Sequence, residues 1–471
     1  LEAASSEPRL ALLRSVREAR SRQMIPRAAA VGVLAIGVGS LLLLLPSRNL
    51  GLGFGALFFI VGGLALLTPV GALLCMHLSR PLLGRVSGSL GLIASRGLVR
   101  SLSRTAPAIA ALSVAVSVTV GLGVMIQSFR GTLAEWLEST LRADVYVSLP
   151  GPTASRASGT LPPELIVSFV GHPDIVGHST YRGVDIVDDV GAFRLVGLAL
   201  DPRGEETFGF IDGDAATIMR AFQNADGALV SEPFAFRRGL GVGDRVQLPT
   251  PAGPQDLPVL GVFYDYGSDQ GAVIVSRLLY DRFFDDSGVT SLALFVRPEA
   301  DSEAVVGDLL TMVPAGTTVV ARTNDVLRTA SLEVFDRTFE VTAVLRMLAF
   351  IVAFVGVLSA LMALELERAR ELGVMRAWGL EPGELRRLVL TQTGLMGLVS
   401  GALAIPMGIA LSAVMIFVIN KRSFGWTLDM QFGPGVLAEA LGLALVAALL
   451  AGVYPAWRMS RTSPAVALRG E

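Results

Sequence analysis

Six stretches of the chain are apolar enough and long enough to cross a lipid bilayer. A membrane helix needs about 20 consecutive apolar residues, and each stretch approaches or exceeds that length. The first of them is ended by Pro46. The stretches cover residues 28–45, 53–76, 106–127, 345–364, 388–419 and 435–456. This pattern predicts a polytopic α-helical membrane protein with six transmembrane helices.

The long middle segment, residues 128–340, has a different pattern. Short β-rich runs alternate there with turn residues and short helical patterns. The runs cover residues 144–148, 193–200, 246–248, 257–263, 272–275 and 291–296. About 210 residues suffice for one or two compact units. We predict a large α+β domain inserted between the third and fourth spans, with helical stalks over 129–141 and 332–346 that carry it on the membrane.

The distribution of Lys and Arg orients these spans. The segments 1–27, 77–105, 365–387 and 457–471 contain six, five, five and three basic residues. The turns 46–52 and 420–434 contain one and two. Because basic loops stay in the cytoplasm, we expect both ends of this segment to be cytoplasmic and the α+β domain to be extracytoplasmic.

These observations divide the chain into nine parts. Within the second basic segment, residues 98–104 are predicted to form a helix that lies along the membrane surface. The parts are a cytoplasmic N-terminal segment (1–27), two linking transmembrane helices (28–76), a cytoplasmic amphipathic segment (77–105), a transmembrane helix (106–127), the extracytoplasmic domain (128–340), a transmembrane helix (341–364), a cytoplasmic segment (365–387), two transmembrane helices (388–456) and a cytoplasmic tail (457–471).

The cytoplasmic segment 365–387 contains more charged and apolar residues than a simple turn between two spans requires. It has Glu367 and Glu371 at helical spacing, five arginines, apolar residues and a helix start led by Pro382. Its charged and apolar side chains do not separate cleanly at 100° per residue. Two interpretations stay open on the residues alone: a basic loop that sets topology, or a helix that contacts a cytosolic partner.

The same segment resembles a known family. Residues 367–379, ERARELGVMRAWG, resemble the E-R-x-R-E-(I/L)-G-x-x-R-A-x-G signature of FtsX-like, MacB-type ABC permeases, bacterial membrane proteins that include the lipoprotein-releasing permeases. The resemblance implies a coupling helix that docks on a cytosolic ATPase. It implies ATPase-coupling roles for six residues: Glu367, Arg368, Arg370, Glu371, Arg376 and Gly379.

Two further regions are similar to that family. Residues 228–233 (ALVSEP), 239–248 and 265–271 (DYGSDQG) resemble its periplasmic core domain, although Gly243-Asp244 read locally is a turn before a strand. The tail 456–471 resembles the end of a permease unit, and residues 8–12 echo residues 464–468. The resemblance therefore implies the C-terminal half of a duplicated ten-span permease.

Candidate chemistry is sparse. The one lysine, Lys421, lies in no Gly-Lys-Ser/Thr motif, so this chain lacks a phosphate-binding loop for ATP. The three histidines and the single Cys75 form no metal-ligand pattern, and a net charge of −2 does not favour nucleic acid. Asp185, Asp188 and Asp189 have the spacing of a strand end or turn. We expect a non-catalytic subunit with no cofactor of its own.

Two functions remain. The first is a permease subunit of an ABC transporter in a bacterial cell membrane. A separate cytosolic ATPase dimer, with its own ATP and Mg, would drive two permease units, the second being an N-terminal half or another chain. The substrate would be a lipid, lipoprotein or amphiphile, exported or extracted from the bilayer. The alternative is an ATPase-driven regulator of an extracytoplasmic cell-wall hydrolase or sensor kinase, without transport.

Overall fold

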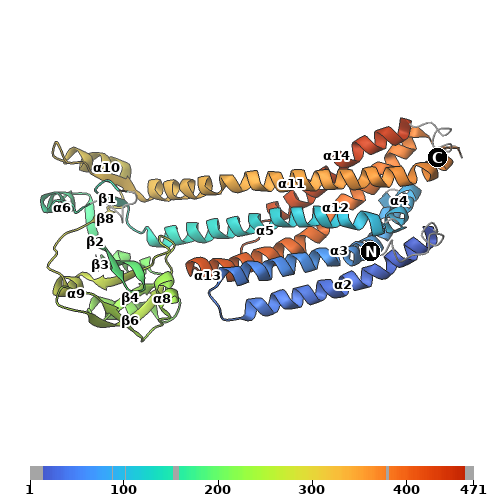
Figure 1. The fold of residues 1–471 in the computed structure, drawn as a ribbon. Helices are drawn as coiled ribbons and strands as arrows, with labels where there is room; N and C mark the ends of the chain where they lie inside the picture. Colours follow the sequence, from blue (N-terminus) through green and yellow to red (C-terminus); the bar gives the residue numbers. More distant parts are fainter. Residues whose placement is uncertain (1–13, 87, 101, 152–158, 378–380, 462–471) are drawn as a thin grey trace. The chain divides into compact units, whose positions relative to one another are not determined.

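The computed structural model describes residues 14–86, 88–100, 102–151, 159–377 and 381–461 (Figure 1). The chain forms two compact units. The helical unit comprises Leu1–Ser128, Phe339–Ile419 and Met430–Glu471, and the sheet unit comprises Phe129–Thr338 and Asn420–Asp429. The sheet unit is therefore larger than the predicted domain 128–340, because it also contains a loop from between the last two spans.

The helical unit is built from long helices. They are α2 (Arg14–Leu44), α3 (Leu50–Val86), α4 (Gly88–Arg100), α5 (Leu102–Thr140), α11 (Asn324–Ala377), α12 (Pro382–Val414) and α14 (Pro434–Arg461). All except α4 contain a stretch long and apolar enough to cross a membrane, so six candidate spans lie in the described residues. The predicted six-span architecture is confirmed. Two of the helices, α5 and α11, continue from the helical unit into the sheet unit.

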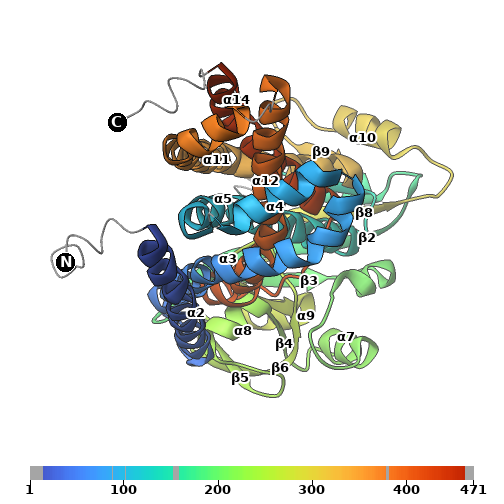
Figure 2. The ribbon, with the colours of Figure 1, turned by 90° about the vertical axis from the view of Figure 1, so that its right-hand side faces the viewer.

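The first two spans form a close antiparallel pair. After Pro46, the Asn49 side chain accepts a hydrogen bond of 2.8 Å from the Gly51 backbone N–H and starts α3. A Cβ on Gly32 of α2 would lie 2.7 Å from the Gly63 carbonyl oxygen of α3. Glycine thus lets the two backbones touch, and α2 and α3 run side by side in both ribbon views (Figure 2).

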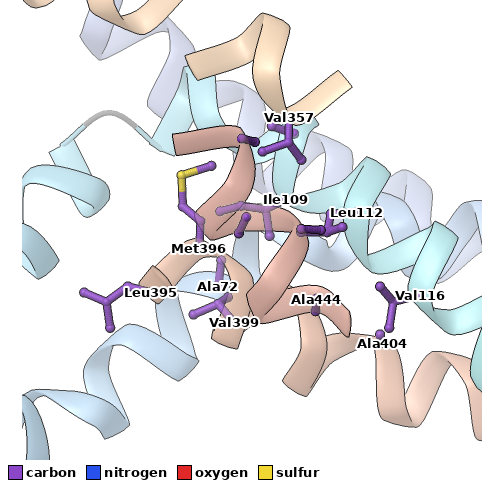
Figure 3. Close-up of a cluster of buried hydrophobic side chains, with 14 of the residues drawn as sticks. Ala72, Ile109, Leu112, Val116, Val357, Leu395, Met396, Val399, Ala404 and Ala444 are labelled. Carbon is purple, nitrogen blue, oxygen red and sulfur yellow. The ribbon is translucent and has the colours of Figure 1, made fainter. Parts of the chain in front are cut away.

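The core of the helical unit is packed around small side chains. Five buried alanines of α14 face the rest of the bundle: Ala440, Ala444, Ala447, Ala448 and Ala451. On α12, a Cβ at Gly397 would lie 2.7 Å from the Ala448 Cβ. Larger side chains from α3, α5, α11 and α12 fill the same cluster (Figure 3). Close approach of α12 and α14 therefore depends on residues without bulky side chains.

The predicted surface helix over 98–104 includes residue 101, which lies outside the described residues, so it stays a prediction. The described chain before it forms α4 and the described chain after it forms α5. Ala94 and Leu98 of α4 are buried in the bundle core. Part of α4 thus packs against other helices of the bundle, while Ile93 on the same helix is exposed.

The sheet unit contains a mixed sheet with the strand order β5-β6-β4-β7-β3-β2-β8-β1-β9. Its strands are β1 (Val145–Ser148), β2 (Ile175–Asp188), β3 (Gly191–Ala199), β4 (Ala228–Ser231), β5 (Arg245–Leu248), β6 (Gln255–Phe263), β7 (Ala272–Ser276), β8 (Ser291–Val296) and β9 (Val320–Thr323). The pairs β3–β7 and β4–β6 are parallel and the others are antiparallel. Every predicted β-run lies on a strand. The strands that the pattern missed, β2, β4 and β9, are either very short or rich in polar residues.

Short helices cover this sheet. They are α6 (Pro163–Val170), the 3-10 helix η3 (Pro202–Thr207), α7 (Ala215–Gln223), α8 (Glu232–Arg238), α9 (Arg277–Phe283) and α10 (Ser302–Thr311). One buried cluster joins α8 and α9 to the strands, a second joins α6 and α10, and a third joins α7. The α+β prediction for this region is confirmed.

Candidate coupling segment and a loop bound by the sheet unit

The predicted coupling residues lie at the end of the longest helix. Glu367, Arg368, Arg370, Glu371 and Arg376 all fall within α11, which is helical from Asn324 to Ala377. Glu367 and Glu371 are one helical turn apart, as their spacing predicted. Residues 378–380 lie outside the described residues, and so does the predicted role of Gly379 in ending the helix.

The chain resumes with a well-defined helix start. Glu381 is the N-cap of α12, Pro382 is the first helical residue, and the Glu381 and Glu384 side chains form a reciprocal capping box. Leu385 and Leu388 are buried, whereas Arg386 and Arg387 are exposed. The second part of the predicted segment therefore anchors an apolar face in the bundle and presents two arginines outward.

A second site emerges between the last two spans. After α12 the chain continues through a π-helix η4 (Met415–Asn420) and a short helix α13 (Lys421–Phe424). Gly425 then adopts a left-handed conformation with φ of 79°, which glycine tolerates because it has no Cβ. Residues 420–429, which we call the 420–429 loop, belong to the sheet unit.

The 420–429 loop is bound through one buried carboxylate. Glu232 begins α8, and its side chain is only 4% exposed. Lys421 Nζ donates to Glu232 Oε1. Thr427 donates from its backbone N–H to Oε2 at 2.9 Å and from its hydroxyl to Oε1 at 2.6 Å. One loop therefore supplies a cation and two further donors to this carboxylate.

Aromatic side chains surround this carboxylate site. Trp426 stacks on Phe424 and packs against Phe129 of α5 and Tyr266. The Tyr266 hydroxyl donates to the Thr427 carbonyl at 2.5 Å. Burial, and then the nearby Glu232 carboxylate, raise the pKa of Tyr266 above its ordinary value. The phenol therefore keeps its proton and acts as a donor to the loop.

The motifs noticed in the sequence have clear structural roles. Tyr266 lies in the segment 265–271, and Glu232 lies in the segment 228–233. Asp244 accepts a hydrogen bond of 2.7 Å from the Gly241 N–H in the turn that precedes β5. The interpretation of Gly243-Asp244 as a turn is confirmed.

The predicted strand-end role of the acidic cluster is also supported. Asp188 ends β2, accepts hydrogen bonds from the backbone N–H groups of Val190 and Gly191, and pairs with Arg238 at 2.7 Å. Arg238, with the turn amides, holds the pKa of Asp188 below its usual value. Asp185 pairs with Arg194 at 2.8 Å. These carboxylates thus stabilise a hairpin, and the prediction that the chain binds no metal stays a prediction.

Comparisons with known proteins show what this chain is similar to. Residues 343–464 match the family FtsX-like permease C-terminal. The chain is 41% identical over 478 residues to the "Uncharacterized ABC transporter permease protein Rv0987" of Mycobacterium tuberculosis, covering 100% of this chain and 56% of that protein. The chain therefore spans little more than half the length of this relative.

Two further relatives are shorter matches. The macrolide export ATP-binding/permease protein MacB of Syntrophobacter fumaroxidans is 30% identical over 125 residues, covering 26% of this chain and 16% of that protein. The lipoprotein-releasing system transmembrane protein LolC of Xylella fastidiosa is 26% identical over 270 residues, covering 52% and 64%. The chain thus contains an FtsX-like permease domain, and its relatives are named as ABC transporter permease, MacB and LolC proteins. Both findings are consistent with the FtsX/MacB-type permease that the coupling-segment motif predicted.

The sequence reasoning missed the Glu232–Lys421 pair. The sequence analysis considered the single lysine, Lys421, only as a candidate for a phosphate-binding loop. Two signals could have pointed to it. Glu232 is a charged residue within an apolar run, and Lys421 is the only lysine in the chain. Neither signal identifies which residue pairs with the other, because Glu232 and Lys421 are 189 positions apart.

Proposed function

We propose that this chain is a permease subunit that passes the work of a separate cytosolic ATPase to its sheet unit. The observation that carries the proposal is the continuity of α11. This single helix of 54 residues begins in the sheet unit and ends with the predicted coupling residues. A continuous helix transmits displacement along its axis because every peptide is held by i→i−4 hydrogen bonds.

The proposed partner chemistry follows from the charges of the coupling segment. Glu367, Arg368, Arg370, Glu371 and Arg376 would form charge-assisted hydrogen bonds with the ATPase, and Gly379 would let the chain turn back toward α12. The ATPase would act as a dimer on this chain and on a second permease unit. ATP and Mg would be bound by the ATPase and not by this chain.

The proposed substrate is hydrophobic or lipid-linked. Two relatives are named for macrolide export and lipoprotein release, and both names describe the export or release of a substrate. These names favour a transporter over the regulator of a wall hydrolase or sensor kinase. Stimulation of ATP hydrolysis by lipoprotein or amphiphile, but not by a wall hydrolase, would separate the two functions.

The proposed location is a bacterial cell membrane, with the coupling segment and the ends of this chain in the cytoplasm and the sheet unit outside. The distribution of basic residues supports this orientation. Single-cysteine variants in a Cys75→Ser background test it. We expect Val187→Cys, which is exposed in the sheet unit, to react with an impermeant maleimide in intact cells, and Arg387→Cys to react only after lysis. Labelling of both sites from one side would contradict the proposal.

Charge reversal in the coupling segment tests the ATPase contact. We expect Glu367→Lys combined with Glu371→Lys to abolish co-purification of the ATPase with the tagged full chain, because paired charges would become repulsive. Membrane insertion should be unchanged. Glu333→Lys combined with Glu340→Lys makes the same charge change at the other end of α11 and should leave co-purification intact. Equal recovery of the ATPase with both double variants would remove the coupling assignment.

A further inference from the structure

The 420–429 loop connects two membrane helices, yet its contacts are with the sheet unit. It is joined covalently to Ile419 and Met430 of the helical unit at its two ends. Most loops of this length between membrane helices need only to reverse the chain direction. This loop also provides hydrogen bonds, an ion pair and aromatic contacts to residues of α5, α8 and the β6–β7 connection.

The Glu232 carboxylate depends on this loop. A carboxylate that is 4% exposed has lost nearly all of its hydration, and removing the partner of a buried charge is strongly destabilising. Lys421 and Thr427 supply the compensating cation and donors. Detachment of the 420–429 loop would leave the buried Glu232 carboxylate without these partners. The state in which the loop is bound to α8 is therefore strongly favoured over the detached state.

The loop backbone is shaped to fit α8. A Cβ on Gly425 would lie 3.1 Å from the Pro233 Cα and 3.2 Å from the Phe236 Cβ. Lys421 Nζ lies 5.7 Å from the centre of the Phe236 ring, a cation–π contact. The compact ammonium of lysine fits between this ring and the carboxylate, whereas the broad planar guanidinium of arginine demands a different geometry. This offers a physical reason for a lysine here in a chain that otherwise uses arginine.

We propose that the 420–429 loop is a mechanical tether, closed by the Lys421–Glu232 pair, through which the fifth and sixth spans move the sheet unit. The helices α5 and α11 are the other two connections between the units. The tether makes the sheet unit respond to α12 and α14 as well as to α11. The coupling part of this inference rests on the proposed function, whereas the attachment of the loop by the ion pair does not.

Thiol labelling tests the attachment without any ATPase. In a Cys75→Ser background, Leu428→Cys places a reporter at a position of the loop that is 2% exposed. The full chain in lipid nanodiscs should react slowly with maleimide. Adding Glu232→Gln or Lys421→Met should raise the labelling rate by about tenfold or more, because the loop opens more often. Asp336→Asn removes an exposed ion pair of the same unit and should leave the rate unchanged.

Two further variants separate opening of the loop from unfolding of the unit. Leu309→Cys, buried in the α10 cluster, should stay slow to react in the Glu232→Gln and Lys421→Met proteins. The exchange variant Glu232→Lys with Lys421→Glu should restore slow labelling at position 428. If all variants label at the parent rate, or if positions 309 and 428 become reactive together, the pair does not close a tether.

An insertion variant tests the coupling. Inserting Gly-Ser-Gly-Ser after Asp429 lengthens the connection between the 420–429 loop and the sixth span, and it leaves the contacts of the loop with the sheet unit in place. We expect ATP hydrolysis by the co-purified ATPase in nanodiscs to change by about fivefold or more, the lower end of typical coupling free energies. The same insertion after Gly253, an exposed hairpin turn with open space around it, should have no effect.

The outcomes of the insertion experiment distinguish failure of the tether from failure of the proposed function. Unchanged hydrolysis in the Asp429 insertion, with the ATPase still bound and Leu428→Cys still protected, would show that the loop is structural only and overturn the tether. Failure of any ATPase to co-purify with the unmodified chain would overturn the proposed function instead. In that case the labelling result would still decide whether Lys421 and Glu232 hold the loop.

Discussion

The two helices that continue into the sheet unit, α5 and α11, differ sharply in how the helical unit holds them. Half of the residues in the most apolar 18-residue stretch of α5 are buried, against 7% for α11. Ser113 of α5 and Ser400 of α12 donate hydrogen bonds to each other's helix backbone. On α11, by contrast, Val357 and Leu361 are buried. Eight described apolar side chains of α11 between 341 and 355 are exposed: Val341, Val344, Leu345, Met347, Leu348, Ile351, Val352 and Val355. One helix is thus built into the bundle and the other contacts it along a narrow face.

Inside the sheet unit the same two helices are joined to each other. Arg130 of α5 pairs with Asp336 of α11, with 2.9 Å between Nε and Oδ1. Their neighbours Phe129 and Phe335 pack edge to face at 5.0 Å. The comparison shows that α11 makes few buried contacts along its apolar stretch in the helical unit, whereas its residues in the sheet unit are joined to α5 by an ion pair and an aromatic contact.

The largest effect on this comparison should come from the aromatic contact. Phe335→Ala should lower the free energy of unfolding of the sheet unit by about 3 kcal/mol, because a buried aromatic ring and its edge-to-face partner are lost. Thermal unfolding of the full chain in nanodiscs, followed through labelling of Leu309→Cys, measures this. Val334→Ala, next to it on α11 but exposed, should cost less than about 0.5 kcal/mol. Equal costs would show that the helices are not joined at Phe335.

A matched pair of glycine substitutions tests the packing difference in the helical unit. A Cβ on Gly408 of α12 would lie 2.5 Å from the Val120 Cβ of α5, whereas one on Gly356 of α11 has open space. Gly408→Leu should destabilise the solubilised chain by about 1–3 kcal/mol through overpacking. Gly356→Leu gains the same helix propensity without a clash and should be neutral or stabilising. A comparable loss in both would mean that α11 is as tightly packed as α5.

The exposed ion pair should have the smallest effect. Arg130 and Asp336 are each about half exposed, so Asp336→Asn should lower the free energy of unfolding by no more than about 1 kcal/mol. Because both groups are exposed to solvent, the attraction between them weakens with salt. Comparing unfolding at low and high ionic strength measures it. A loss of several kcal/mol that is insensitive to salt would indicate that the pair, and not the phenylalanines, joins the two helices.

Several features were predictable because they depend on local pattern. Long apolar runs must become helices in a bilayer, where unpaired backbone groups are too costly, and the six spans followed. The capped start at Glu381 and Pro382, and the strand runs of the middle segment, rely on neighbouring residues. The coupling-segment motif pointed to the family, although the contacts of its charged residues remain a prediction.

What the amino-acid order determined by itself was therefore the class of fold: a six-span helical membrane protein with an inserted α+β domain. Only the tertiary structure decided that α4 packs against the bundle, that α5 is more deeply buried there than α11, and that a loop between two spans belongs to the sheet unit. The physical reason is distance along the chain. The pairing of Glu232 with Lys421 joins residues 189 positions apart. The hydrophobic periodicity of the sequence reports local structure only, so it does not predict which distant cation pairs with a buried carboxylate.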